Sequence, residues 1–178
     1  MTLKSNINIR LATEGDVQLI MGMNNQWITE DPNKIDRSNG YLNVDPFDRN
    51  DLIKIIENKE LIIAEDQDKI VGYYLFDNFS STKYLEQHKA LIKDCIDEGL
   101  LTSDQKISLR MQCVIDSDYQ NQNLSKRMLK ALLIETKDKY DVCFASVSTD
   151  NPKYKAHVKI GWEALKKVDE LILLVYKP

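Results

Sequence analysis

The chain of 178 residues is 43% hydrophobic and 29% charged, which is typical of a globular protein and predicts one domain over residues 1–178. Its net charge of −4 argues against the strongly basic class of nucleic-acid-binding proteins. Apolar runs are far shorter than the ~20 residues of a membrane span, and the first residues lack a signal-peptide core, so we expect a cytoplasmic protein without a membrane partner. Three widely spaced cysteines and two histidines predict no metal site.

The first third of the chain predicts one strand and two helices. Residues 7–12 alternate apolar and polar side chains, as a half-buried strand does. Thr13 is a suitable N-cap for the helix that follows. After the irregular stretch 28–46, residues 48–59 predict a second helix because their apolar side chains share one face.

The middle of the chain predicts a hairpin and a third helix. Residues 61–77 hold two apolar runs around the polar turn 66–69, which is typical of antiparallel strands. Residues 83–100 carry apolar side chains at helical spacing, and Gly99 predicts the helix end. This insertion is longer than an ordinary connection, so it is a candidate partner-binding face or substrate lid.

A strand–helix–strand unit follows. Strands at 106–115 and 140–148 flank a helix at 124–139, and such a unit is expected to be parallel and right-handed. The whole order of elements predicts a mixed α/β fold built on one sheet.

The last segment predicts a short helix and a second hairpin. Asn151 is the expected N-cap of a helix over 151–160, and Gly161 follows its end. Strands at 162–168 and 170–177 close the chain as a hairpin.

The polar loop between residue 115 and the helix at 124 is the strongest functional signal. Peptide N–H groups at a helix start, together with the helix dipole, favour a bound anion and above all phosphate. Lys126 and Arg127 lie in the first helical turn, where cations oppose the dipole unless an anion is nearby. The alternative is a solvated connection with two surface cations, and the pattern alone leaves both interpretations open.

From Ile107 onward the chain resembles the acetyl-CoA-binding half of the GNAT superfamily of N-acetyltransferases. The family signature after its fourth strand is Arg or Gln, two residues, Gly, one residue, and Gly or Ala. Ile115, Ser117 and Tyr119 resemble the usual V-x-P-x-Y lead-in to it, with Ser in place of Pro. The signature itself corresponds to Gln120, Asn121, Gln122, Asn123, Leu124 and Ser125. The helix before Gly161 and the N-terminal strand and helix also resemble the family, so the likeness covers nearly the whole chain.

This chain departs from the family pattern at two positions. Asn123 and Ser125 stand where the family signature has glycines. Asn tolerates a left-handed conformation better than other residues with a side chain, so we expect a positive φ at Asn123. The loop would then still hold pyrophosphate, with weaker affinity. The alternative is a non-catalytic module that binds or senses acyl-CoA.

The resemblance implies a central, mostly antiparallel sheet of six to seven strands with helices on both faces. Its parallel fourth and fifth strands would splay apart to hold acetyl-CoA as cosubstrate. The residues implied in cofactor binding are Cys113, Val114, Ile115, Gln120, Asn121, Gln122, Asn123, Leu124, Ser125, Lys126, Arg127 and Asn151.

The implied reaction transfers an acetyl group directly to a primary amine of a small molecule or peptide. The family commonly places its general acid, a Tyr, four residues before the glycine that here is Gly161, and that count gives His157. Tyr154 lies on the same helix face and is the more conventional acid, so we prefer it and keep His157 as its competitor.

The candidates for the general base and for the acceptor pocket come mainly from the part of the chain before Ile107. Glu65 is preferred over Asp77 as general base, and Trp27 and Tyr41 are expected to line the acceptor pocket. Arg110 and Gln112 cannot act as bases. The resemblance implies neither a nucleic-acid nor a membrane partner, and a homodimer stays open.

Overall fold

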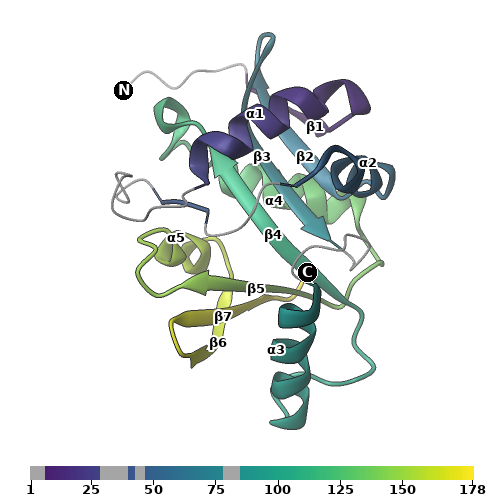
Figure 1. Cartoon of the computed structure of the whole chain (residues 1–178), viewed down its shortest axis with the longest axis vertical. Coiled ribbons are helices and arrows are strands. Elements are labelled where there is room, and N and C mark those ends of the chain that lie inside the picture. Colours follow the sequence, from purple (N-terminus) through teal and green to yellow (C-terminus); the bar gives the residue numbers. More distant parts are fainter. Residues whose placement is uncertain (1–6, 29–39, 43–46, 78–84) are drawn as a thin grey trace.

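The structure is a computed structural model that describes residues 7–28, 40–42, 47–77 and 85–178 (Figure 1). Its seven-stranded sheet has the order β1-β2-β3-β4-β5-β7-β6 and is antiparallel except between β4 and β5. This confirms the predicted mixed α/β fold with a mostly antiparallel sheet. Within the ranges just given, no helix has both the length and the apolar composition that crossing a bilayer requires.

The elements occur in the predicted order. The strands are β1 (Asn8–Leu11), β2 (Leu61–Asp66), β3 (Lys69–Asp77), β4 (Ile107–Ile115), β5 (Val142–Ser148), β6 (Glu163–Val168) and β7 (Leu171–Tyr176). The helices are α1 (Val17–Trp27), α2 (Arg49–Glu57), α3 (Leu85–Asp97), α4 (Leu124–Glu135) and α5 (Tyr154–Lys159), with short 3-10 turns η1 (Glu14–Asp16) and η3 (Ser117–Tyr119).

The entry into α1 is held by one carboxylate. Asp16 accepts hydrogen bonds from the peptide N–H of Thr13 at 2.7 Å and from both terminal nitrogens of Arg10 at 2.8 and 3.0 Å. The bond from Arg10 is the main reason why the pKa of Asp16 falls to about 2. Arg10 also donates to Glu65 at 2.7 Å, so β1, β2 and the start of α1 are tied together.

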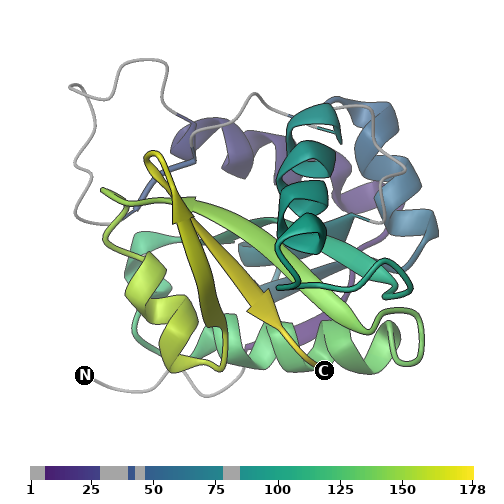
Figure 2. The ribbon, with the colours of Figure 1, turned by 90° about the horizontal axis from the view of Figure 1, so that it is seen from below.

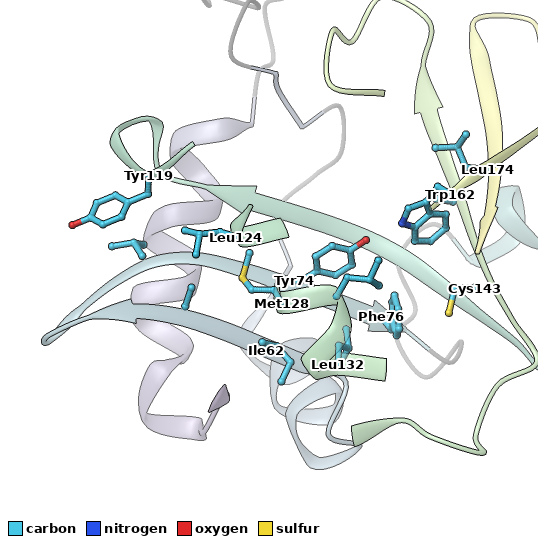
Figure 3. Packing of buried hydrophobic residues seen from close by; sticks show 14 of the residues in the cluster. Ile62, Tyr74, Phe76, Tyr119, Leu124, Met128, Leu132, Cys143, Trp162 and Leu174 are labelled. Carbon is cyan, nitrogen blue, oxygen red and sulfur yellow. The ribbon is translucent and has the colours of Figure 1, made fainter. Parts of the chain in front are cut away.

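Helices cover both faces of the sheet. Figure 2 shows α1, α2 and α3 over one face and α4 and α5 over the other. On the α4 side, Leu124, Met128 and Leu132 are almost fully buried against Tyr74 and other side chains of the sheet (Figure 3). The apolar stripe of α4 therefore fixes the loop before it against the end of β4.

Two helix boundaries differ from the prediction, each for a local reason. α4 ends at Glu135 and not at 139, since the hydroxyl of Thr136 bonds to the carbonyl of Leu132 and Asp138 has a positive φ of 65°. α5 begins at Tyr154 with Lys153 at its N-cap position, so the prediction of Asn151 as N-cap was wrong. The side chain of Asn151 instead accepts from the N–H of Lys153 at 3.0 Å, which forms a turn before the helix. Residues 83–84 of the predicted third helix, and most of the stretch 28–46, lie outside the described residues.

Candidate active site

The parallel strands β4 and β5 diverge along their length. Residues 107–109 of β4 pair with residues 142–144 of β5, and the register ends there although both strands continue. Figure 1 shows the two strands opening into a V toward the carboxyl end of β4. The splay expected from the resemblance is thus confirmed.

A cavity of about 490 Å³ occupies this opening. Its walls come from the ends of β4 and β5, the loop before α4, the exposed face of α5, and the ends of α1 and α3. The sequence-predicted residues on its walls are Trp27, Tyr41, Cys113, Val114, Ile115, Gln120, Asn121, Asn123, Leu124, Ser125, Asn151 and His157. The structure therefore brings most of the predicted cofactor residues to one place.

The edge of β4 supplies backbone groups to the cavity. Residues 113–115 pair with residues 72–74 of β3 on one side and have no β5 partner in the described register on the other. Peptide groups of alternate residues in an antiparallel strand point away from the paired neighbour. Some N–H and C=O groups of this segment therefore face the cavity, where an extended chain could pair with them.

The loop before α4 presents further peptide N–H groups. Asn121 and Asn123 adopt left-handed conformations, with φ of 61° and 59°. The positive φ predicted at Asn123 is confirmed, while the one at Asn121 was not foreseen. The first backbone hydrogen bond into α4 runs from Arg127 to Asn123 at 3.0 Å. The preceding N–H groups at the helix start donate to no backbone carbonyl in the described part of the chain, and they remain able to bind an anion.

The two cations in the first turn of α4 lie outside the cavity wall. Neither Lys126 nor Arg127 lines the cavity, and neither does Gln122. Arg127 donates to the carbonyl of Ile7 at 2.9 Å, which ties the N-terminal segment to α4. Its position is therefore explained by this structural contact.

A different cation, missed in the sequence, lies at the loop. Lys153 lines the cavity and donates through Nζ to Oε1 of Gln120 at 2.9 Å. Gln120 in turn donates to the carbonyl of Ile115 at 3.3 Å, so the loop, the end of β4 and α5 are connected. The sequence holds only a weak signal for this contact, because the two residues are 33 positions apart.

The segment 40–42 closes one side of the cavity. Leu42 N–H donates to the carbonyl of Trp27 at 2.8 Å, and the Tyr41 hydroxyl donates to Asp150. Asn151 donates to the carbonyl of Tyr41 at 3.1 Å. Trp27 and Tyr41, which the sequence analysis assigned to an acceptor pocket, thus form part of the cavity wall between α1 and α5.

A β-bulge in β4 turns Arg110 toward α5. Gln112 pairs with Leu75 and Arg110 with Phe76, so the regular alternation of faces is interrupted between them. The guanidinium lies 3.4 Å from Nε2 of His157 and 5.5 Å from the ring centroid of Trp162. Arg110 is 8% exposed and is charged at neutral pH.

His157 is neutral in this environment. Burial, with a further contribution from the charge of Arg110, lowers the pKa of His157 well below its ordinary value. Because arginine can only donate, Nε2 is the acceptor and the ring proton is on Nδ1. Nδ1 has no partner in the described part of the chain, and His157 lines the cavity. Nδ1–H is therefore a buried donor on a side chain of the cavity wall.

A buried hydrogen-bond network holds Gln112, which lines the cavity. Asn24 of α1 donates to Tyr73 at 2.7 Å and to Oε1 of Gln112 at 2.6 Å, and the Tyr73 hydroxyl also donates to that oxygen at 2.7 Å. Gln112 is 1% exposed, and its Nε2 has no partner among the described residues. The network therefore fixes the Gln112 amide in the cavity wall and leaves a second buried N–H donor there.

The structure does not bring three predicted catalytic candidates to this cavity. Glu65 is paired with Arg10 at the β1–β2 edge, and Asp77 is buried at the end of β3. Tyr154 packs against the core beneath α5. Between the two acid candidates, the cavity contains His157 and not Tyr154.

The thiols are poor nucleophiles. Burial raises the pKa of Cys113, which lines the cavity, and that of Cys143 to about 12. A thiol and not a thiolate is then present at neutral pH, and the thiolate is the nucleophilic form. In the ranges that the structure describes, His, Cys, Asp and Glu side chains form no cluster suited to a metal ion.

No protein-family model matches the sequence, and no curated protein matches it. Solved structures share its fold. An acetyltransferase of the GNAT family from Listeria monocytogenes matches 97% of this chain and 95% of its own, with 17% identity and a TM-score of 0.66. yncA from Salmonella typhimurium, solved with its cofactor acetyl-CoA, matches 97% and 94%, with 15% identity and a TM-score of 0.64. The paia N-acetyltransferase from Thermoplasma acidophilum, in complex with coenzyme A, matches 97% and 99%, with 13% identity and a TM-score of 0.64. These likenesses over nearly the full length of both chains show that the protein has the GNAT acetyltransferase fold.

Proposed function

We propose that the protein is an acetyl-CoA-dependent N-acetyltransferase that acetylates a primary amine by direct transfer. The observation that carries the proposal is the V between β4 and β5, where the edge of β4 that has no β5 partner in the described register leads to the N-terminus of α4. Two solved structures of the same fold are described with acetyl-CoA or coenzyme A, which supports this choice of cosubstrate.

The residues on the walls suit the chemical parts of acetyl-CoA. The pantetheine arm carries amides, and these would pair with peptide groups of residues 113–115. The pyrophosphate would accept from the N–H groups of the loop and helix start, whose cavity-lining residues are Asn121, Asn123, Leu124 and Ser125, with Lys153 adding positive charge. Asn123 already adopts the left-handed conformation that a glycine would supply, so we expect the loop to be competent.

Transfer forms a C–N bond and breaks a C–S bond. The amine nitrogen attacks the thioester carbonyl carbon, the sulphur leaves, and the proton lost by nitrogen is balanced by the one gained by sulphur. We assign to His157 a hydrogen bond from Nδ1–H to the departing sulphur, which requires no ionised imidazole. The high pKa of Cys113 argues against an acetylated cysteine intermediate.

The proposed general base is His88 of α3. Among the described residues that line the cavity there is no Asp or Glu, and His88 is the other histidine. Its Nε2 lies 3.2 Å from the hydroxyl of Ser146 in β5, which positions the ring at the splayed end of the pair. Histidine is the most common general base in enzymes. We therefore assign the general base to His88 in place of Glu65. His88 lies on α3, within the insertion that the sequence analysis considered as a substrate lid.

Calorimetry with acetyl-CoA and CoA tests the first part of this function. Release of free thiol in the presence of a panel of primary amines then tests transfer. Binding together with amine-dependent thiol release is expected. Binding without turnover of any amine would favour the alternative of a non-catalytic acyl-CoA-binding module, and absence of binding at millimolar CoA would exclude both functions.

A further inference from the structure

Arg110 is a buried charge with no ion-pair partner among the residues that the structure describes. It is 8% exposed, and its described contacts are a neutral imidazole and the Trp162 ring. Its Nε donates to nothing in the described part of the chain, and no described carboxylate forms an ion pair with it. Burying an ion is energetically unfavourable unless it is paired, so this arrangement favours a negative ligand.

The rest of the described cavity wall is also positively charged and carries hydrogen-bond donors. Its described lining includes Lys153 and Lys159 in addition to Arg110, and includes no Asp or Glu. The polar atoms left without partners on buried lining residues are all donors, namely Arg110 Nε, Gln112 Nε2 and His157 Nδ1. Buried donors without acceptors are rare in folded proteins, so these groups together call for a ligand rich in acceptors.

The phosphates of the cosubstrate are not this ligand. They would lie at the start of α4, whereas Arg110 is five residues back along β4 from the strand end at Ile115. At a rise of about 3.3 Å per residue, and with one bulge, the separation is roughly 13–16 Å. Arg110 therefore lies near the thioester end of the groove, where the acyl acceptor must enter.

We infer that Arg110 binds a carboxylate of the acyl acceptor, so that the substrate is a small molecule with both a primary amine and a carboxylate. This inference rests on the proposed acetyltransferase function. A small acceptor fits because the cavity of about 490 Å³ must also contain the end of the pantetheine arm. The planar guanidinium binds carboxylates through two parallel hydrogen bonds, and Gln112 adds a single donor beside it.

The test uses acceptors in matched pairs: common amino acids and their carboxamides, which keep the amine and lose the negative charge. Thiol release is measured with acetyl-CoA for the wild type, for Arg110→Gln, and for Lys130→Gln. The last variant removes a positive charge from the exposed face of α4 and serves as the control. The wild type and Lys130→Gln are expected to prefer an acid over its amide, and Arg110→Gln should lose roughly 10- to 100-fold in kcat/KM for the acid alone.

A second measurement separates the inference from the proposed function. Calorimetry should find the same acetyl-CoA affinity in the wild type and in Arg110→Gln, and titration of the acids into the CoA complex should detect binding in the wild type only. If Arg110→Gln lowers turnover of acids and amides equally, or if no acid is favoured over its amide in either assay, the inference is overturned while the acetyltransferase function stands. If acetyl-CoA does not bind at all, the proposed function fails first.

A second variant tests the role of Arg110 if Arg110→Gln does not fold. Melting curves are recorded for each variant, and Arg110→Lys replaces Arg110→Gln if the latter does not fold. Lysine keeps the charge but loses the two-pronged geometry. It should therefore retain a preference for acids that is weaker than that of the wild type, and an undiminished preference would overturn the assignment.

Discussion

Arg110 and His157 lie side by side in the cavity, and each restricts what the other can do. The guanidinium donates to Nε2, which leaves the imidazole neutral with its proton on Nδ1. A neutral imidazole is a weak proton donor but an effective hydrogen-bond donor to a developing negative charge. The catalytic contribution that we expect from His157 is therefore electrostatic.

The first prediction separates the two acid candidates on α5. His157→Leu should lower kcat roughly 100-fold, since it removes a donor of the kind that stabilises developing charge. His157→Gln keeps an N–H and should be milder. Tyr154→Phe should leave kcat nearly unchanged because Tyr154 does not line the cavity. Steady-state kinetics with the melting temperature of each variant check this, and a silent His157→Leu beside an inactive Tyr154→Phe would reverse the assignment.

The second prediction concerns stability against pH. The unfolded chain protonates His157 near pH 6.5, but burial holds the pKa of the folded form well below that. As the pH falls below about 6.5 the unfolded state binds more protons, so the free energy of unfolding should decrease, by at most ~1.4 kcal/mol per pH unit from this group. Above pH 6.5 the effect should vanish.

Urea denaturation at several pH values between 5 and 7 measures this slope. His157→Gln should show a shallower slope than the wild type. His88→Gln, which removes the other histidine, is the matched control and should keep the contribution of His157. Equal slopes for the wild type and His157→Gln would show that the buried ring is not held neutral.

At the scale of elements, the proposed phosphate site depends on the loop between β4 and α4. Two asparagines take left-handed conformations there, which lets consecutive N–H groups turn toward the cavity. A left-handed conformation costs roughly 1–2 kcal/mol for most residues, and less for Asn. The asparagines thus do in this loop what glycine does in the related signature.

The third prediction follows from that geometry. Asn123→Gly should leave the affinity for CoA unchanged or increase it, because glycine adopts the same φ without strain. Asn123→Ala should weaken binding and lower stability by about 1 kcal/mol, because alanine lacks this tolerance. Calorimetry with CoA on both folded variants decides the matter. Loss of binding in a folded Asn123→Gly would mean that the amide side chain itself holds the ligand.

For the whole molecule, the sheet consists of two parts that meet along a short seam. Strands β1–β4 form one part and β5–β7 the other, and only residues 107–109 and 142–144 join them in the register. Packing from α3 and α4 supplements the seam. A ligand in the V would contact both parts, so its binding energy should stabilise the whole fold.

The fourth prediction is that CoA raises global stability. At a concentration 100 times its Kd, a ligand specific for the folded state adds about 2.7 kcal/mol to the free energy of unfolding, or roughly 5–10 °C in Tm for a chain of this size. Scanning calorimetry measures the shift. Amide hydrogen exchange should slow at residues 113–115 and 121–126 together, and protection confined to another surface would place the ligand elsewhere.

Local patterns in the sequence were sufficient to predict most of the helices and strands. Apolar periodicity of 2 or 3.6 residues distinguished the strands from the helices, because each element must bury one face. The polar loop before α4 was evident from its composition, whereas the left-handed Asn123 was expected from the resemblance, because Asn123 stands where the family signature has glycine. The splay of β4 from β5 came only from the resemblance, since no local pattern encodes it.

Tertiary structure decided which side chains meet in the V. A bulge between Arg110 and Gln112 changes the face to which Arg110 points, and strict alternation along the strand would have placed it wrongly. The contacts of Lys153 with Gln120 and of His157 with Arg110 join residues 33 and 47 positions apart. Sequence alone identified the strand, the loop and the helix, because these depend on near neighbours. The charge and the donors of the site depend on burial and on distant partners, and only the folded chain determines those.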